Sequence, residues 1–411
     1  MVTRMDGARK MRALDVGVVG AGTAGSAAAI FLRRAGHQVT IYERVPDPSP
    51  VGAGIVLQPT GVTVLKRLGL DEAVVSRGAR LDRLRCLTSR GRQVVDLPYR
   101  LLGEGLHGHG MHRGVIFETL YHAARDAGAA VLSGRGVREL QARSADRLGI
   151  VDDHGVRRGN HDLVIVADGA RSQLRGDTDP EIKKSVRPYR WGALWFVGHD
   201  SQHRFVGELH QIVEGTRRMM GLLPTGLGPR GDVPLVSLFW SLRADRLDEW
   251  RRTGLGHWKS ELLRYAPEAE SLVAQITHPD QVLFSQYHDV VMDRWHTRNV
   301  VYLGDAAHAM SPQLGQGCNL ALYDAMVLAD TVAAHSDLPT ALADYTRRRR
   351  RHLGIYQLAT RWLTPFFQSD LPLALARDLG LGLLGRIPWI RRRMVASMCG
   401  YLLGPFASLD P

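Results

Sequence analysis

The sequence predicts an α/β fold with two lobes and a helical C-terminal segment, and three observations lead to this prediction. Two apolar runs, 14–20 and 38–42, enclose a helix-like stretch over 23–35, which indicates a βαβ unit. Between about 185 and 290, short apolar runs alternate with turns that contain glycine and proline, which indicates an antiparallel sheet. After 290 a buried strand and a long helix return, so the first lobe is discontinuous in the sequence.

The remaining elements can be placed in order along the chain. We expect a hairpin around Arg90-Gly91, and the other expected elements are a helix over 113–127, strands over 162–167 and 299–303, and helices over 247–265 and 319–335. The first lobe would then comprise 14–80, 105–180 and 290–355. The second lobe would comprise 81–104 and 181–289, and a helical segment over 356–411 would follow.

Composition limits the function classes that need to be considered. The formal charge is +12, but 48 of the 53 basic residues are arginine, and this bias makes charge weak evidence for a nucleic-acid partner. Cys86, Cys318 and Cys399 lie far apart, so we expect neither a disulfide framework nor a metal site. No run of about 18 apolar residues marks a spanning helix, and the N-terminal residues lack the apolar segment of a signal peptide. We therefore expect a cytoplasmic protein without nucleic acid, and the oligomeric state stays open.

A glycine-rich segment follows the first expected strand and opens the first helix. Its residues are Gly20, Ala21, Gly22, Thr23, Ala24 and Gly25. In this context a G-x-G-x-x-G segment favours a Rossmann-like dinucleotide site, because glycines permit the turn, the approach of a pyrophosphate and close helix packing. Glu43 ends the second strand, beside Arg44, where a carboxylate can accept hydrogen bonds from an adenosine ribose. An acid at this place favours FAD or NAD over NADP.

A second motif indicates which dinucleotide is bound. The stretch 301–308 ends a strand with Gly304-Asp305, and Pro312, Gly315-Gln316-Gly317 and Asn319 follow. An aspartate at a strand end can accept hydrogen bonds from a polyol such as the ribityl chain of a flavin. The glycines let the backbone approach a flat ring, and the helix from about Asn319 would direct its positive end at that ring.

With Asp168-Gly169 between them, these segments resemble the three motifs of the para-hydroxybenzoate hydroxylase type, the group A FAD-dependent monooxygenases. The resemblance runs from about 14 to about 353. It implies non-covalently bound FAD, NADH or NADPH as co-substrate, and O₂. It further implies that Asp305 binds the ribityl chain and that Asp168 and Gly169 contribute to both FAD and NAD(P)H binding. The loop 51–55 with Gly54, the pre-helix Arg113 and the backbone of Val137 would also contact FAD.

The resemblance also implies a mechanism in which a C4a-hydroperoxyflavin hydroxylates an aromatic, lipophilic small molecule. The backbone of Pro312, Gly315 and Gly317 would face the reactive edge of the flavin ring, and the Pro312 carbonyl would hold the hydroperoxide proton. His210 and Tyr287, on strands of the second lobe, are candidates for a group that favours phenolate formation. For each of them a packed or surface position is the simpler interpretation.

Alternatives stay open for the reaction and for the C-terminal segment. The same FAD lobe could serve a reductase, dehydrogenase or epoxidase, or an inert fold in a basic membrane-surface protein. Residues 341–411 contain 11 arginines and four aspartates together with many leucines. This segment could contact an anionic membrane peripherally. The simpler interpretation is a set of helices that packs over the second lobe.

Overall fold

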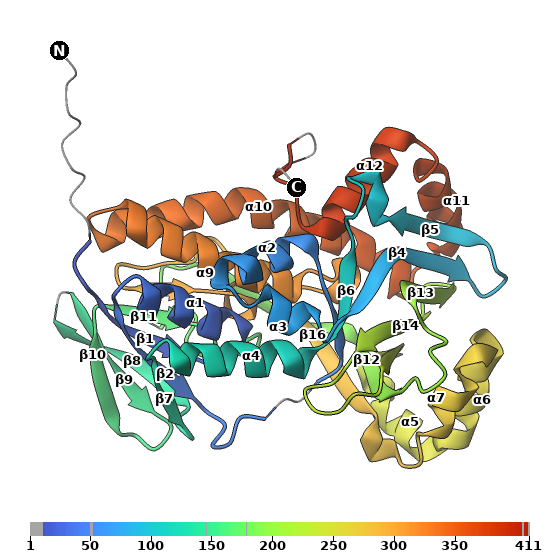
Figure 1. The fold of residues 1–411 in the computed structure, drawn as a ribbon, viewed down its shortest axis with the longest axis horizontal. Coiled ribbons are helices and arrows are strands. Elements are labelled where there is room, and N and C mark those ends of the chain that lie inside the picture. The colour runs from blue at the N-terminus through green and yellow to red at the C-terminus, as the bar shows by residue number, and fades with distance from the viewer. Residues whose placement is uncertain (1–10, 50–51, 145, 178, 405–406, 410–411) are drawn as a thin grey trace.

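The computed structural model describes residues 11–49, 52–144, 146–177, 179–404 and 407–409 (Figure 1). Val51 of the expected flavin loop lies outside this range. A five-stranded sheet with all neighbours parallel forms the first layer, in the order β17-β11-β1-β2-β7. Its strands are β1 (Asp15–Val19), β2 (Gln38–Glu43), β7 (Ala130–Ser133), β11 (Leu163–Val166) and β17 (Val300–Tyr302). The four residues of β11 are all buried, as expected for a parallel strand that is covered on both faces.

Helices cover one face of this parallel sheet. α1 packs on α4 and α9, and α9 packs on α2 and α10. These helices are α1 (Thr23–Arg34), α2 (Pro59–Leu68), α4 (Arg113–Asp126), α9 (Gly317–Ala334) and α10 (Leu338–Phe367), and the short α3 (Asp71–Val75) follows α2. α9 starts at Gly317, two residues before the position expected from the sequence. The first lobe is thus the expected βαβ arrangement, closed by segments from far along the chain.

A three-stranded antiparallel sheet, which no pattern in the sequence predicted, covers the other face. Its strands are β8 (Val137–Ser144), β9 (Arg147–Asp152) and β10 (Arg157–His161). A Cβ atom at Gly17 of β1 would lie 2.6 Å from the His161 ring, so β10 packs tightly here. β10 has the sequence RRGNH and lacks apolar alternation, which is why periodicity missed it.

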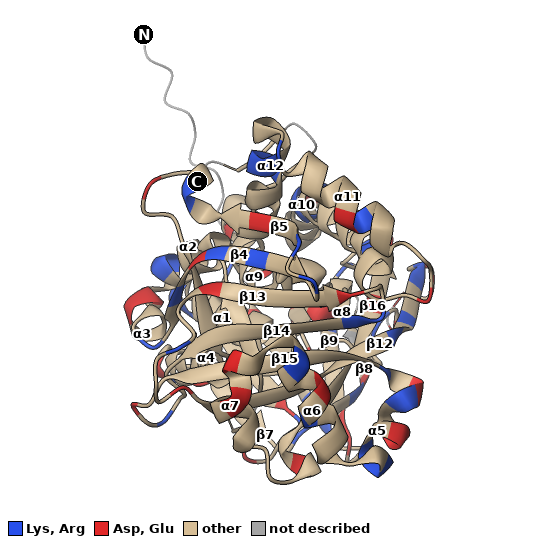
Figure 2. Ribbon diagram, turned by 90° about the vertical axis from the view of Figure 1, so that its right-hand side faces the viewer, with Lys and Arg blue, Asp and Glu red and all other residues tan. Residues whose placement is uncertain are grey.

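The second sheet has nine strands and forms the other lobe (Figure 2). Its order is β16-β12-β15-β14-β13-β4-β6-β3, with β5 paired to β4. The strands are β3 (Gly54–Leu57), β4 (Ala79–Thr88), β5 (Gln93–Pro98), β6 (Gly108–His112), β12 (Lys184–His199), β13 (Gly207–Glu214), β14 (Arg218–Gly226), β15 (Leu235–Arg243) and β16 (Leu283–Met292). The expected hairpin around Arg90-Gly91 is β4–β5.

The strands expected between about 185 and 290, β12 to β16, pair with one another in antiparallel fashion, as expected. β13 also pairs in parallel with β4, which comes from an earlier part of the chain. β3 and β6, whose residues were assigned to the first lobe, pair with strands of this sheet. The helix expected over 247–265 is interrupted at Gly254, whose φ of 84° and ψ of 161° are not helical. It forms α5 (Leu247–Thr253) and α6 (Leu255–Tyr265).

The C-terminal segment is helical, as expected. α11 (Ala374–Leu384) contacts β5, and α12 (Pro388–Cys399) contacts β5 and the short helix η1 (Tyr99–Leu101) (Figure 1). The remaining short helices are α7 (Glu270–Ala274), α8 (Asp305–His308), η2 (Ala244–Arg246), η3 (Pro267–Ala269), η4 (Pro279–Gln281) and η5 (Pro312–Leu314). Across the described chain, no helix combines the length and the apolar character needed to cross a membrane.

Candidate active site

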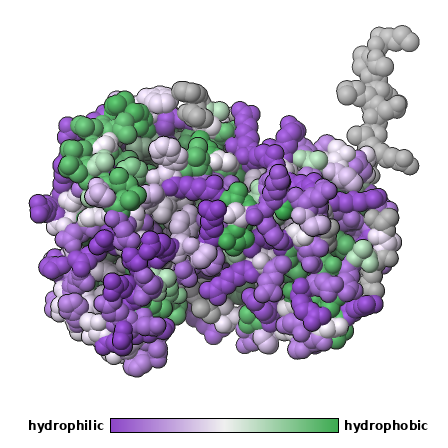
Figure 3. All heavy atoms as spheres, turned by 180° about the vertical axis from the view of Figure 1, so that it is seen from behind, coloured by the Kyte–Doolittle hydropathy of each residue, from purple (hydrophilic) through white to green (hydrophobic). Residues whose placement is uncertain are grey.

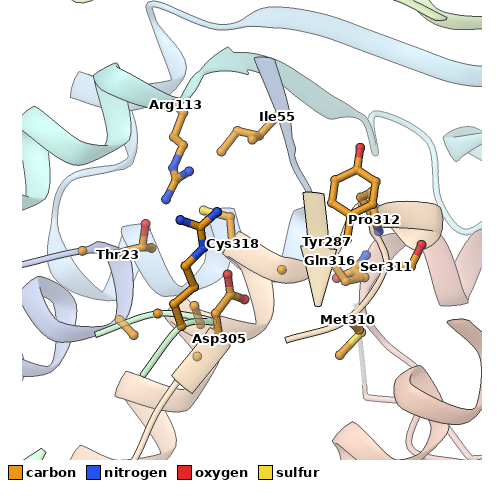
Figure 4. A pocket seen from close by; sticks show the side chains of 18 of the residues that line it. Thr23, Ile55, Arg113, Tyr287, Asp305, Met310, Ser311, Pro312, Gln316 and Cys318 are labelled. Carbon is orange, nitrogen blue, oxygen red and sulfur yellow. The ribbon is translucent and has the colours of Figure 1, made fainter. Parts of the chain in front are cut away.

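One cavity of about 730 Å³ lies where the two lobes meet. The glycine-rich turn after β1, the ends of β2 and β11, and the loop from 303 to 318 line one part of it. One face of the nine-stranded sheet lines most of the rest. Figure 4 shows Thr23, Arg113 and Asp305 on one side of this cavity and Tyr287, Pro312 and Gln316 on the other. The motifs that are nearly 300 residues apart in the sequence therefore face a common space.

The glycine-rich turn has the geometry that a pyrophosphate site requires. A Cβ atom at Gly25 would lie 2.0 Å from the Gly20 carbonyl oxygen, so only glycine allows this packing. A Cβ atom at Gly22 would have no other atom within 4 Å. Gly22 lines the cavity together with Gly20, Thr23 and Ala24. Ala21 does not line the cavity. Its backbone N–H donates to Glu43 Oε2 (2.8 Å), which fixes the carboxylate at the cavity wall.

Most of the other predicted cofactor residues also line the cavity. They are Arg44, Gly54, Arg113, Val137, Asp168, Gly169, Asp305, Gly315, Gln316 and Gly317. Asp305 is exposed although its neighbours Leu303 to Ala307 are otherwise buried, so its side chain projects into the cavity. Asp168 Oδ1 is buried and has no hydrogen-bond partner among the described residues.

These features fit FAD. The unpaired carboxylate oxygen of Asp168 and the projecting carboxylate of Asp305 can accept hydrogen bonds from the hydroxyl groups of a polyol. The open space at Gly22 and Gly169 can take a pyrophosphate. Burial raises the pKa of Asp168, and the hydrogen bond from Ser172 only partly offsets this effect. A hydroxyl donor from a bound ligand would stabilise the ionised form of Asp168.

Asn319 lies behind the loop at the reactive edge and does not line the cavity, contrary to its predicted contact with the cofactor. Its Oδ1 accepts from the Gln58 backbone N–H (2.8 Å), and its Nδ2 donates to the carbonyl oxygens of Val56 (3.0 Å) and Gly315 (3.1 Å). These bonds hold the loop against β3. Asn319 is therefore a positioning residue, because its side chain points toward the backbone of β3 whereas its neighbours Gly317 and Cys318 line the cavity.

The Gln316 side chain ties the same loop to the C-terminal segment. It is buried, and its Nε2 donates to the Met398 carbonyl oxygen at the end of α12. In the same region His352 Nε2 lies 2.8 Å from the Gly400 carbonyl oxygen. The loop that carries Pro312, Gly315 and Gly317 is thus supported by residues more than 80 positions later in the chain.

The two candidate substrate residues differ in their placement. His210 points away from the cavity and lies 3.3 Å from Glu208 Oε1, whereas its neighbours Leu209 and Gln211 line the cavity. The prediction for His210 was wrong because side chains alternate along β13 and the sequence did not fix which face is inside. Tyr287 does line the cavity. Burial raises the pKa of Tyr287 despite hydrogen bonding to Trp195, so its hydroxyl is protonated at neutral pH and can donate a hydrogen bond.

Arg175 supports the site, although no motif in the sequence predicted this role. It is buried, and its guanidinium donates to the carbonyl oxygens of Ala306 (2.5 Å), Ala170 (2.8 Å) and Ser172 (2.8 Å). It therefore joins the loop after Asp168-Gly169 to the helix that starts at Asp305. The sequence shows only an arginine seven positions after Asp168, and hydrophobic periodicity does not indicate which backbone groups such an arginine contacts.

Replacing Arg175 with alanine should loosen both cofactor loops. Several buried carbonyl groups lose a charged donor, so we expect a loss of at least about 2 kcal/mol in the free energy of unfolding. Weaker FAD retention should accompany this loss. Urea unfolding and flavin content after gel filtration would measure both effects. Arg187→Ala, an exposed position on β12, is the matched control, with an expected change within about 0.5 kcal/mol. Equal behaviour of the two variants would contradict the role given to Arg175.

Comparisons with known proteins agree with this geometry. A family model described as "FAD binding domain" matches residues 13–354. Aurachin C monooxygenase/isomerase of Stigmatella aurantiaca is 29% identical over 346 residues, which covers 81% of this chain and 84% of the relative. "Probable 2-heptyl-3-hydroxy-4(1H)-quinolone synthase" of Rhodococcus erythropolis is 27% identical over 334 residues, covering 81% and 83%.

A solved structure shows the same fold. The R204Q form of HpxO from Klebsiella pneumoniae, in complex with FAD, superimposes with a TM-score of 0.78 at 24% identity and covers 95% of this chain and 100% of that chain. The resemblance drawn from the three motifs is confirmed, and with it the use of FAD, NAD(P)H and O₂. The chain belongs to the FAD-binding-domain family and is an FAD-dependent monooxygenase of the aromatic-hydroxylase type.

Proposed function

We propose that this monooxygenase hydroxylates an uncharged, lipophilic aromatic compound. One observation carries the proposal: the part of the cavity lined by the nine-stranded sheet contains no charged side chain among the described residues. The charged residues of the lining belong to the nucleotide side, and they are Glu43, Arg44, Arg113, Arg138, Asp153, Asp168, Arg171 and Asp305. A substrate carboxylate would therefore have no cation to pair with in the sheet-lined part of the pocket.

The substrate side combines aromatic rings with neutral polar groups. The rings of Trp195 and Phe239 lie 5.3 Å apart, centroid to centroid, and they form an apolar wall for a flat molecule. The other lining residues of β4 and β12 to β16 are Leu84, Ala193, Leu209, Gln211, Met219, Leu223, Ser241 and Tyr287. Gln313 donates to Gln368 (3.2 Å) at the border of this region. Amides and hydroxyls can bind carbonyl, phenol or ring N–H groups without a net charge.

The protein's part in the reaction is to position the substrate and to exclude water. Bound FAD would supply the hydride acceptor and activate O₂, so that the substrate, O₂, NAD(P)H and a proton give the hydroxylated product, water and NAD(P)⁺. We propose that the Pro312 carbonyl, with the backbone of Gly315 and Gly317, holds a proton at the reactive edge of the ring. Tyr287 then donates a hydrogen bond to the substrate and does not act as a base. The quinolone named for the Rhodococcus relative is a compound of the proposed class.

A substrate panel tests this proposal. NADH and NADPH oxidation in air should be stimulated by uncharged alkylquinolones or phenols with little release of peroxide, and much less by aromatic carboxylates. Preferred stimulation by carboxylates would contradict the uncharged substrate. Product formation without matching O₂ consumption would indicate a reductase on the same fold.

Gln211→Arg provides a sharper test, because it places a cation on the lining of β13. We expect the KM for an uncharged substrate to rise at least about tenfold, since the new charge loses hydration when the substrate binds. Aromatic carboxylates should gain in kcat/KM. The exposed loop position Gln202 gives the matched control Gln202→Arg, which should leave both values unchanged.

We also propose a cytoplasmic location. The three cysteines are free thiols, and burial raises the pKa of Cys86 to about 12 and that of Cys318 to about 11, so that both are protonated. Unpaired thiols fit a reducing compartment. Peripheral contact with a membrane through the C-terminal helices is a further proposal, which rests on the exposed apolar side chains of α11.

A further inference from the structure

Helix α11 has an unusual distribution of side chains, because it buries an arginine and exposes four of its five leucines. Arg377 is 1% exposed and donates to the carbonyl oxygens of Gly215 (2.7 Å) and Phe366 (3.1 Å). In contrast, Leu375, Leu379 and Leu383 are 67%, 40% and 57% exposed. The inner side of the helix, which contacts β5, thus carries the buried Arg377 together with Leu381, which packs on a buried apolar cluster. The apolar side, with residues at intervals of four, faces outward.

The exposed leucines belong to a larger apolar area. Among the described residues, the exposed large apolar side chains between 371 and 389 form what we call the α11 surface: Leu371, Leu375, Leu379, Leu383, Leu384, Ile387 and Trp389. Figure 3 shows this area as a green region at the end of the molecule that carries α11 and α12. Contiguous apolar areas of this kind are rare on soluble monomers unless another surface covers them.

The charges around the α11 surface are positive. Asp378 within this stretch pairs with Arg377 (2.7 Å), and Asp370 just before it pairs with Arg243 (2.7 Å), so both aspartates are neutralised. Arg386 is exposed and has neither an ion pair nor a side-chain hydrogen bond among the described residues, and the exposed Arg392 bonds only to the Leu101 carbonyl oxygen. A second copy of the chain would bring the same positive charge to the interface. An anionic surface complements it.

We propose that the α11 surface binds peripherally to an anionic lipid bilayer. Leucine, isoleucine and tryptophan side chains would enter the headgroup boundary, and Arg386 and Arg392 would contact the anionic headgroups. Gln368, which lines the cavity, precedes Leu371 by three residues, so the α11 surface begins at the border of the substrate region. The enzyme would thus meet a lipophilic substrate where that substrate concentrates. The proposal goes beyond the hydroxylation itself and does not require any particular substrate.

Vesicle flotation with the FAD-loaded enzyme tests the proposal. We expect the protein to float with vesicles of phosphatidylcholine and phosphatidylglycerol, less with phosphatidylcholine alone, and less again at high salt. The variant Leu375→Ser/Leu379→Ser/Leu383→Ser should reduce the vesicle-bound fraction at least about tenfold, because it removes the apolar contact. Leu283→Ser, half exposed on β16 outside the α11 surface, is the matched control and should bind like the wild type.

A second variant keeps the test decisive if the triple variant folds poorly. Arg386→Gln/Arg392→Gln should weaken binding to the anionic vesicles and reduce its dependence on salt, with flavin content unchanged. Wild-type protein that stays in solution with both kinds of vesicle would overturn the proposal. So would a dimer in gel filtration that the triple variant abolishes in the absence of any vesicle binding, because a second copy would then cover the α11 surface.

Discussion

Replacing Arg349 with methionine is expected to lower the free energy of unfolding by about 3 kcal/mol. Arg349 Nε donates to Asp324 Oδ1 (2.6 Å), and both side chains are fully buried. Without Arg349, the Asp324 carboxylate remains in the core with one charged partner fewer. The expected loss lies at the lower end of the range for broken buried pairs, because His308 and the Gly304 N–H still contact Asp324. Urea unfolding at neutral pH would measure it.

The neighbouring residue offers a control. Arg348 is half exposed and pairs with Asp344 (2.8 Å), so Arg348→Met should change the free energy of unfolding by less than about 1 kcal/mol. A loss of the same size in both variants would show that the effect comes from packing along α10 and not from the buried pair.

The effect of Arg349→Met should also depend on pH. Burial alone would raise the pKa of Asp324, but the charges of His308 and Arg349 outweigh it and hold the pKa below its usual range. A depressed pKa contributes stability that is fully present above the unfolded-state value of about 4 and is lost as the pH falls toward the folded-state value. The wild type loses this contribution in acid, whereas the variant has less of it to lose. The difference between the two proteins should therefore shrink below about pH 4.

Asp305→Ala is expected to weaken FAD binding by about 10- to 100-fold. A carboxylate that accepts hydrogen bonds from ligand hydroxyls contributes about 1.5–3 kcal/mol, and a factor of ten corresponds to about 1.4 kcal/mol. Asp305 is well suited to this role because its side chain points into the cavity and has no side-chain partner among the described residues. Titration of the apoprotein with FAD, followed by flavin fluorescence, would give the two dissociation constants.

Two companion variants separate binding from folding. Asp305→Asn keeps an acceptor oxygen and should lose less affinity than Asp305→Ala, whereas Asp248→Ala, on the exposed helix α5, should bind FAD like the wild type. Because the Asp305 side chain makes no contact that supports the fold, the unfolding of the apoprotein should barely change. FAD affinity at the wild-type level in Asp305→Ala would refute the ribityl assignment.

The fold class was predictable because the glycine-rich turn and Gly304-Asp305 are short motifs. Their backbone conformation requires particular residue types, so both can be recognised in the sequence. Glu43 ends β2 and Asp305 follows the end of β17 by three residues, so both lie at the carboxyl edge of one parallel sheet and their convergence follows from the parallel order. The direction of His210 could not be predicted, since a shift of one residue along β13 reverses the face. The contacts of Arg175 and Asn319 are long-range hydrogen bonds to backbone atoms, and no local pattern encodes them.

The bond from Gln316 to Met398 has a consequence for how the protein is made. Residues near 400 are synthesised more than 80 positions after the loop that faces the flavin ring, yet they brace it. The glycine-rich turn can form early in synthesis, but the reactive edge reaches its final shape only after residues 398–400 have been made. A nascent chain or a C-terminally truncated product would therefore be expected to hold the nucleotide end of FAD before it can shield the oxygen-reactive end from water.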